Sequence, residues 1–197
     1  YGSVVAGGMD NCANSTNTTV SGGYHNAATG SFATVVGGDT NVSSGNCSFI
    51  GGGGQNNAIA FYGTVGGGFG NTASGTCSSV SGGQSNISSG GSSVVGGGRN
   101  NNVSGLCSVI SGGKNNTASG LYSVIAGGVG GTASTNAFVG SGFNSSATGI
   151  RSTVVGGENN TASGNCSFLG SGRLNVASGN SSAISGGRNN TISGVYS

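Results

Sequence analysis

Apolar residues return along this chain at one fixed interval, and small or polar residues fill the space between them. Counted from a double glycine, a phrase of fifteen residues repeats from residue 7 to the end, as in Gly112–Ala126 (GGKNNTASGLYSVIA). Only the unit at 127–140 is one residue shorter. A fixed period of this kind indicates a solenoid, in which each repeat forms one coil. We therefore expect a single repeat array over residues 1–197, cut from a longer repetitive protein because it begins and ends in mid-repeat.

Position fourteen of the repeat carries a branched aliphatic residue in every complete unit. The residue two places earlier is small, and this period of two predicts a strand over positions twelve to fifteen, with twelve and fourteen facing inward. A second short strand is expected over positions five to eight, with five and seven inward. The expected core residues at position fourteen are Val20, Val35, Ile50, Val65, Val80, Val95, Ile110, Ile125, Val139, Val154, Leu169 and Ile184.

Glycines at positions one, two and nine are expected to form the corners between these strands, because left-handed backbone angles favour glycine. The density of glycine excludes a helix, at about 1 kcal/mol per glycine relative to alanine. The predicted fold is therefore an all-β solenoid, a parallel β-roll of about thirteen coils stacked about 4.8 Å apart.

Position five is almost always asparagine. Inward amides that repeat at one position can hydrogen-bond to each other or cap the backbone of the turns, so we interpret these residues as structural. The predicted asparagine ladder comprises Asn26, Asn41, Asn56, Asn71, Asn86, Asn101, Asn116, Asn160, Asn175 and Asn190.

Position thirteen is expected to face outward, yet it holds large apolar side chains in several coils and threonine in others. A repeated apolar stripe on an outer face favours a partner surface, and the simplest partner is a second copy of the chain. The predicted self-association stripe comprises Phe49, Val94, Val109, Val124, Phe138 and Phe168.

The segment Ser152–Gly164 (STVVGGENNTASG) resembles the head repeats of YadA-like trimeric autotransporter adhesins, and the resemblance extends over the whole chain. It implies a left-handed parallel β-roll that associates as a trimer on a cell surface and binds host matrix or other cells. The repeat here departs from the family pattern by its second glycine, which lengthens each coil.

The composition narrows the partners that we expect. Of 197 residues, 46 are glycine, none is proline and 4% are charged, against roughly 25% charged residues in ordinary domains. A net charge of +2 is too small to indicate nucleic acid or an anionic membrane surface. No apolar run approaches the roughly 20 residues that span a bilayer, so no membrane insertion is expected within this segment.

We favour two hypotheses, a structural role and an adhesive role, over catalysis. Three acidic residues and one histidine leave little capacity for acid–base chemistry or metal binding, so no cofactor is expected. Ice binding is disfavoured because the outer threonines of position thirteen are interrupted by Phe and Val. We expect a structural module of an extracellular fibre or filament on a cell or virion surface. The alternative is an adhesin head that binds cell-surface or matrix ligands.

Four of the five cysteines, Cys47, Cys77, Cys107 and Cys166, occupy position eleven. The first three are two coils apart, or roughly 9.6 Å, which exceeds the Cα separation of about 4.4–6.8 Å in a disulfide. They are therefore either free thiols or bridges between copies of the chain.

Sequons for N-glycosylation are unusually dense. Asn41 and Asn86 belong to the ladder and are expected to be inaccessible, whereas sequons at positions four and ten lie on corners that face solvent. A coat of glycans on these corners would keep so uncharged a surface soluble. The candidate glycosylation sites are Asn46, Asn115, Asn144, Asn159, Asn165, Asn180 and Asn189.

Overall fold

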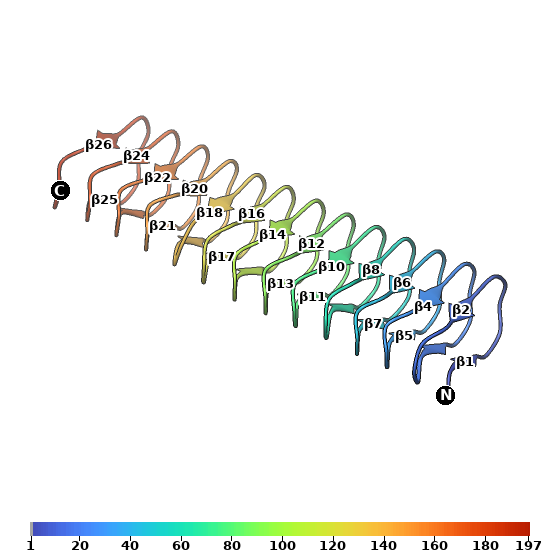
Figure 1. Cartoon of the computed structure of the whole chain (residues 1–197). Coiled ribbons are helices and arrows are strands. Elements are labelled where there is room, and N and C mark those ends of the chain that lie inside the picture. The colour runs from blue at the N-terminus through green and yellow to red at the C-terminus, as the bar shows by residue number, and fades with distance from the viewer. Residues whose placement is uncertain (1) are drawn as a thin grey trace. The chain divides into compact units, whose positions relative to one another are not determined.

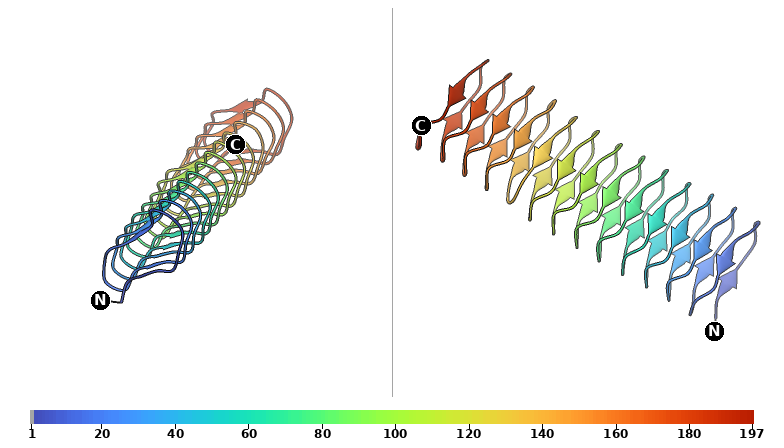
Figure 2. Two further views of the ribbon diagram at one scale, coloured as in Figure 1. Left: turned by 90° about the vertical axis from the view of Figure 1, so that its right-hand side faces the viewer. Right: turned by 45° about the horizontal axis from the view of Figure 1, so that its top comes forward.

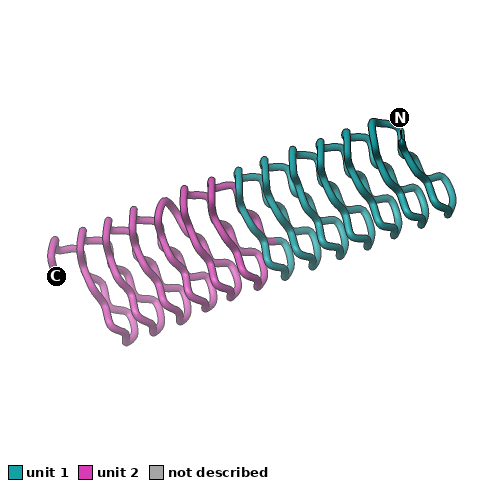
Figure 3. The backbone as a smooth tube through the Cα atoms, turned by 90° about the horizontal axis from the view of Figure 1, so that it is seen from below, with its two compact units in different colours: residues 1–100 teal, residues 101–197 magenta. Residues whose placement is uncertain are grey.

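The computed structural model describes residues 2–197, so Tyr1 lies outside the described part of the chain. The chain is an all-β solenoid of about thirteen turns, with about fifteen residues in each turn and two parallel sheets (Figure 1). The predicted fold class is confirmed. The turns divide into two compact units, residues 1–100 and 101–197, which are coloured separately in Figure 3.

In the first unit, every coil contributes one strand to each of two sheets. One sheet contains the odd-numbered strands β1 (Val4–Val5), β3 (Thr19–Val20), β5 (Thr34–Val35), β7 (Phe49–Ile50), β9 (Thr64–Val65), β11 (Ser79–Val80) and β13 (Val94–Val95). The other contains β2 (Cys12–Ala13), β4 (Ala27–Ala28), β6 (Val42–Ser43), β8 (Asn57–Ala58), β10 (Thr72–Ala73) and β12 (Ile87–Ser88).

The second unit repeats this arrangement. Its even-numbered strands are β14 (Asn102–Val103), β16 (Thr117–Ala118), β18 (Thr132–Ala133), β20 (Ser146–Ala147), β22 (Thr161–Ala162), β24 (Val176–Ala177) and β26 (Thr191–Ile192). Its odd-numbered strands are β15 (Val109–Ile110), β17 (Val124–Ile125), β19 (Phe138–Val139), β21 (Thr153–Val154), β23 (Phe168–Leu169) and β25 (Ala183–Ile184). Within each unit the strands of a sheet lie in one row (Figure 2).

The register is set by the repeat, because each residue pairs with its equivalent in the next coil, as Val109 does with Val124. The strands are shorter than predicted, covering positions six to seven and thirteen to fourteen only. A third ladder, which we did not predict, runs through position three as single parallel bridges, for example Phe69↔Gln84 and Glu158↔Arg173. Position three varies between charged, polar and aromatic residues, so no periodic pattern of hydrophobicity marks it.

The core is a thin column between the sheets. Position fourteen is buried throughout, with Leu169 fully enclosed, and position seven adds small residues such as Ala73 and Ala118. Serine at position twelve completes the interior of most coils, and its hydroxyl often binds the same coil, as when Ser93 Oγ donates to Gly90 O at 2.6 Å. Ser108 Oγ instead donates to Gly120 O of the next coil, and Ser167 Oγ is buried without a partner among residues 2–197. Each coil therefore buries about three side chains besides its asparagine, and its remaining stabilisation comes from stacking on its neighbours.

The residues with left-handed backbone at the corners are not all the ones that we predicted. Glycines at position two do have positive φ, from 84° to 113°. Positions four and eleven are also left-handed, although most of their residues are not glycine; the non-glycine residues there have φ between 49° and 62°. Glycines at position nine have no positive φ. At most of them a Cβ would overlap the backbone of the next coil, as one on Gly105 would overlap Gly120 O, although Ser15 and Ala60 occupy the same position in their coils.

The short unit at 127–140 keeps its strands in phase. β17 pairs with β19 through Val124↔Phe138, and β18 pairs with β20 through Thr132↔Ser146. The missing residue is at the corner around Ser134 and Thr135, after which Asn136 takes the left-handed position. The irregularity therefore changes one corner and leaves the faces of both sheets unchanged.

Candidate functional surfaces

The side chain of each position-five asparagine in the ladder joins its own coil to the next one. In Asn71, Nδ2 donates to Gly67 O and to Gly83 O, both at 2.9 Å, and Oδ1 accepts from the Asn86 N–H at 3.0 Å. The first of these bonds closes the corner of its own coil and the other two bind the next coil. From Asn26 to Asn175 the predicted ladder residues are fully buried, whereas Asn190 in the last coil is exposed.

The ladder is interrupted where Gly131 and Ser145 replace asparagine. Asn116 Oδ1 still accepts from the Gly131 N–H at 2.8 Å. Gly131, however, has no side chain that could bind the following coil. Ser145 is buried and its Oγ has no hydrogen-bond partner within residues 2–197. Buried polar groups without partners cost free energy, so this is the weakest section of the asparagine ladder.

The position-thirteen residues of the self-association stripe point outward, but to different extents. Phe49, Phe138 and Phe168 are about 40% exposed, whereas Val94, Val109 and Val124 are half-buried. A glycine lies two residues after each of these three phenylalanines. A side chain at that glycine would contact the phenylalanine ring, as at Gly170 beside Phe168. The rings thus cover backbone of their own strand and still present an apolar edge to solvent.

The candidate glycosylation sites fall into two geometries. At position ten, the amide oxygen of the asparagine binds the preceding coil, as when Asn165 Oδ1 accepts from the Ile150 N–H at 3.0 Å. The sequon serine that follows, Ser167, is buried. At position four, the sequon hydroxyl lies on an outward strand position, as Thr161 does for the half-buried Asn159.

The remaining position-four and position-ten sites are all exposed: Asn46, Asn115, Asn144, Asn165, Asn180 and Asn189. Asn41 and Asn86 are fully buried in the ladder. Among the seven candidate sites, only those at position four therefore present both the asparagine and the sequon hydroxyl outward.

All five cysteines are free thiols. Cys77, Cys107 and Cys166 are exposed at the left-handed position eleven, and Cys47 is half-buried there. Cys12 is exposed on β2. Exposed apolar residues adjoin this column of thiols, among them Phe61 and Tyr62, whose rings contact edge to face with centroids 4.2 Å apart.

Charged side chains are few and lie on corners. Arg173 Nε is 3.3 Å from Glu158 Oε2, and His25 Nε2 is 3.2 Å from Asp10 Oδ2, with all four side chains well exposed. Exposed pairs of this kind contribute little to stability. In the part of the chain that the structure describes, no three His, Cys, Asp or Glu side chains lie together as metal ligands.

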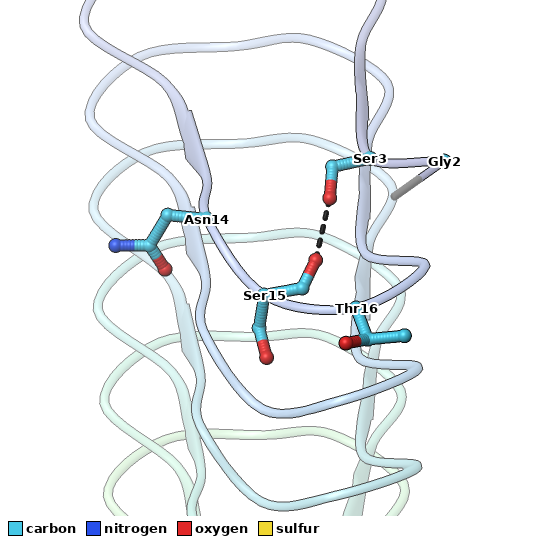
Figure 4. Close-up of a pocket in the computed structure, with 5 residues that line it drawn as sticks. All are labelled: Gly2, Ser3, Asn14, Ser15 and Thr16. Carbon is cyan, nitrogen blue, oxygen red and sulfur yellow. Dashed lines mark hydrogen bonds between the residues drawn. The ribbon is translucent and has the colours of Figure 1, made fainter.

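A cavity of about 600 Å³ lies beside the first coil and is lined by Gly2, Ser3, Asn14, Ser15 and Thr16 (Figure 4). The Ser3 hydroxyl donates to Ser15 O across it. Its lining is made of small polar groups and one amide, with no titratable side chain among the five residues.

Sequence reasoning missed the outward face of the even-numbered sheet. In the second unit, position six of this face holds Thr117, Thr132, Ser146 and Thr161 in register. Its signal in the sequence is the Thr-Ala-Ser that recurs at 117–119, 132–134 and 161–163.

No segment within residues 2–197 forms a helix long and apolar enough to cross a bilayer. In comparisons with known proteins, no family model matches the chain and no curated protein is significantly similar to it.

Proposed function

We propose that this chain is a structural module of an extracellular or surface fibre, assembled from β-roll coils that associate with further copies of the chain. The observation that carries the proposal is the stacking of each coil on the next through the asparagine ladder and the aliphatic column. The repeat resembles the head of YadA-like adhesins, which favours a left-handed roll and a trimer.

The stripe at position thirteen is the surface through which we expect copies to associate. Replacing Phe138 and Phe168 together by serine should lower the mass of the assembly measured by analytical ultracentrifugation, because apolar area leaves the interface. The matched control is Phe143→Ser, since Phe143 is similarly exposed but lies on position three. An assembly unchanged by the double substitution, or a wild-type chain that is monomeric, would overturn self-association through this stripe.

Electron microscopy of the native material distinguishes the two structural functions. Continuous filaments support the fibre, whereas discrete trimeric heads support an adhesin that binds host matrix or cell-surface ligands. An adhesin head would present a distinct patch on otherwise uniform coils, but the short unit at 127–140 leaves both sheets in register. For this reason we place the fibre first.

N-glycosylation is part of the proposal for a chain that passes through a eukaryotic secretory route. Among the candidate sites, only the position-four sequons present both the asparagine and the hydroxyl outward. We therefore expect glycans on Asn115, Asn144, Asn159 and Asn189 before Asn46, Asn165 and Asn180. Mass spectrometry of glycopeptides measures the occupancy directly. An intact mass equal to that of the polypeptide alone would contradict it.

A further inference from the structure

The even-numbered sheet of the second unit presents a regular array of hydroxyl groups to solvent. At position six the array contains Thr117, Thr132, Ser146, Thr161 and Thr191, interrupted only by Val176. At position eight, two residues further along each coil, it continues with serine or threonine from Ser119 to Ser193. We call these two columns, in residues 117–193, the hydroxyl face.

The backbone fixes the spacing of the hydroxyl face. Thr117 pairs with Thr132, Thr132 with Ser146, and Ser146 with Thr161. The ladder bonds beneath them are uniform, from Thr117 N–H to Gly131 O at 2.8 Å and from Thr161 N–H to Asn175 O at 2.9 Å. Hydroxyls therefore recur about every 4.8 Å from coil to coil and about 6.6 Å between positions six and eight.

The hydroxyl face is neutral, and few of its hydroxyls are used within the protein. Ser178 is an exception, because its Oγ donates to Ile192 O at 3.2 Å. The two columns of the face contain no charged residue, although roughly a quarter of the residues in an ordinary domain are charged. The hydroxyls of Thr117, Thr132 and Thr161 form no hydrogen bond with the part of the chain that the structure describes. Each of these three threonine hydroxyls remains free to donate one hydrogen bond and to accept two, beside its own methyl group.

These observations identify the kind of ligand that the face fits. A charged ligand would find no counter-charge, and an isolated small molecule would meet only one or two members of a long array. A ligand whose own oxygen atoms repeat in two dimensions with similar spacings can meet all of them at once. Ice is neutral, and its surface has oxygen atoms that donate and accept hydrogen bonds on a lattice with repeats of a few ångströms.

We propose that the hydroxyl face binds the surface of ice crystals. The array would hold water molecules in positions that continue the lattice, and water-mediated hydrogen bonds of this kind are nearly as favourable as direct ones. The corresponding face of the first unit is mixed, with Val42 and Ile87 at position six, so the site belongs to the second unit. The inference does not rest on the proposed fibre, because a single chain carries the whole array.

The test measures thermal hysteresis and the shape of ice crystals in a solution of the full chain, produced without N-glycosylation so that no sugar on Asn115 or Asn159 covers the face. Thr132→Tyr and Thr161→Tyr each place a large ring within the array. Their matched controls are Val42→Tyr, at the equivalent position of the first unit, and Thr153→Tyr, outward on the other sheet of the second unit. Circular dichroism confirms that each variant is folded.

We expect hysteresis and faceted crystals for the wild-type chain and for both controls, and loss of most of the hysteresis in Thr132→Tyr and Thr161→Tyr. A folded wild-type chain without hysteresis overturns the proposal, including the case in which it sediments with a crystalline polysaccharide instead. Full hysteresis in both array variants overturns it too, as does an equal loss in the folded Thr153→Tyr control.

Discussion

A ladder asparagine makes three hydrogen bonds that serine at the same position cannot reproduce. In Ser145 the side chain is too short to reach Ser141 O and Gly157 O, which correspond to the two acceptors of Asn71. Its Oγ is buried without a partner. The cost of this substitution is local, because the coils on either side keep their strand pairing.

Ser145→Asn should therefore stabilise the protein. The new amide would bind the two carbonyl groups and accept from the Asn160 N–H, for a gain of about 1–3 kcal/mol in the free energy of unfolding. Urea denaturation measures the change. Asn71→Ser removes the hydrogen bonds of one ladder asparagine and should lower the free energy of unfolding by a similar amount. If Ser145→Asn leaves the free energy of unfolding unchanged while Asn71→Ser lowers it, the polar groups around Ser145 are already hydrogen-bonded in solution.

Glycines at different corner positions should respond in opposite ways to alanine. A Cβ on Gly105 would overlap Gly120 O, whereas one on Gly112 meets nothing within 4 Å, and neither glycine has positive φ. Gly105→Ala should prevent folding or cost several kcal/mol. Gly112→Ala should stabilise by about 0.4–1 kcal/mol, because the unfolded chain loses entropy. Thermal melts of the two variants measure the change in stability. Equal changes in the two variants would contradict the different environments assigned to Gly105 and Gly112.

At the scale of single residues, the sequence predicts the inward side chains well and the backbone poorly. Position fourteen and position five are recognisable because their chemistry is constant, as in Val80 and Asn86. The left-handed backbone of Cys47 or Tyr122 could not be predicted, because these residue types carry no preference for it. The constraint comes from closing a narrow coil, which neighbouring coils impose together.

At the scale of the strand, adjacent residues of β23 have opposite environments. Leu169 is fully buried, and its truncation to alanine should cost about 2–5 kcal/mol by leaving a cavity. Phe168 is 42% exposed, so only part of its surface leaves water on folding. In a dilute monomer, Phe168→Ala should therefore lower the free energy of unfolding by less than Leu169→Ala does. Comparing urea midpoints at low and high protein concentration separates this loss from loss of association. A larger cost for Phe168→Ala than for Leu169→Ala in the monomer would contradict the assignment of the two faces.

The strands also show why a third ladder was not predicted. Periodic hydrophobicity identifies strands that bury one face, and position three buries neither, as Lys114 and Phe69 illustrate. Its bridges form because residues before and after it are already stacked in register. The hydroxyl face was missed for a related reason, since outward residues such as Thr132 contribute nothing to the core pattern.

At the scale of the whole molecule, stability should depend little on ionic strength. Only eight residues are charged, and the two ion pairs among residues 2–197 are exposed. Salt screens exposed charges most effectively, so raising sodium chloride from about 0.05 M to about 0.5 M should change the free energy of unfolding by less than about 1 kcal/mol. Urea denaturation at the two concentrations measures this. A steep dependence would show that charge governs stability despite its scarcity.

The fourteen-residue coil shows where this chain tolerates a change of length. Losing a residue near Ser134 alters one corner while Val124 still pairs with Phe138. A deletion inside a strand would instead exchange inward and outward residues from that point in the coil. The corner is therefore the part of the coil where the chain can change length while both sheets keep the same faces.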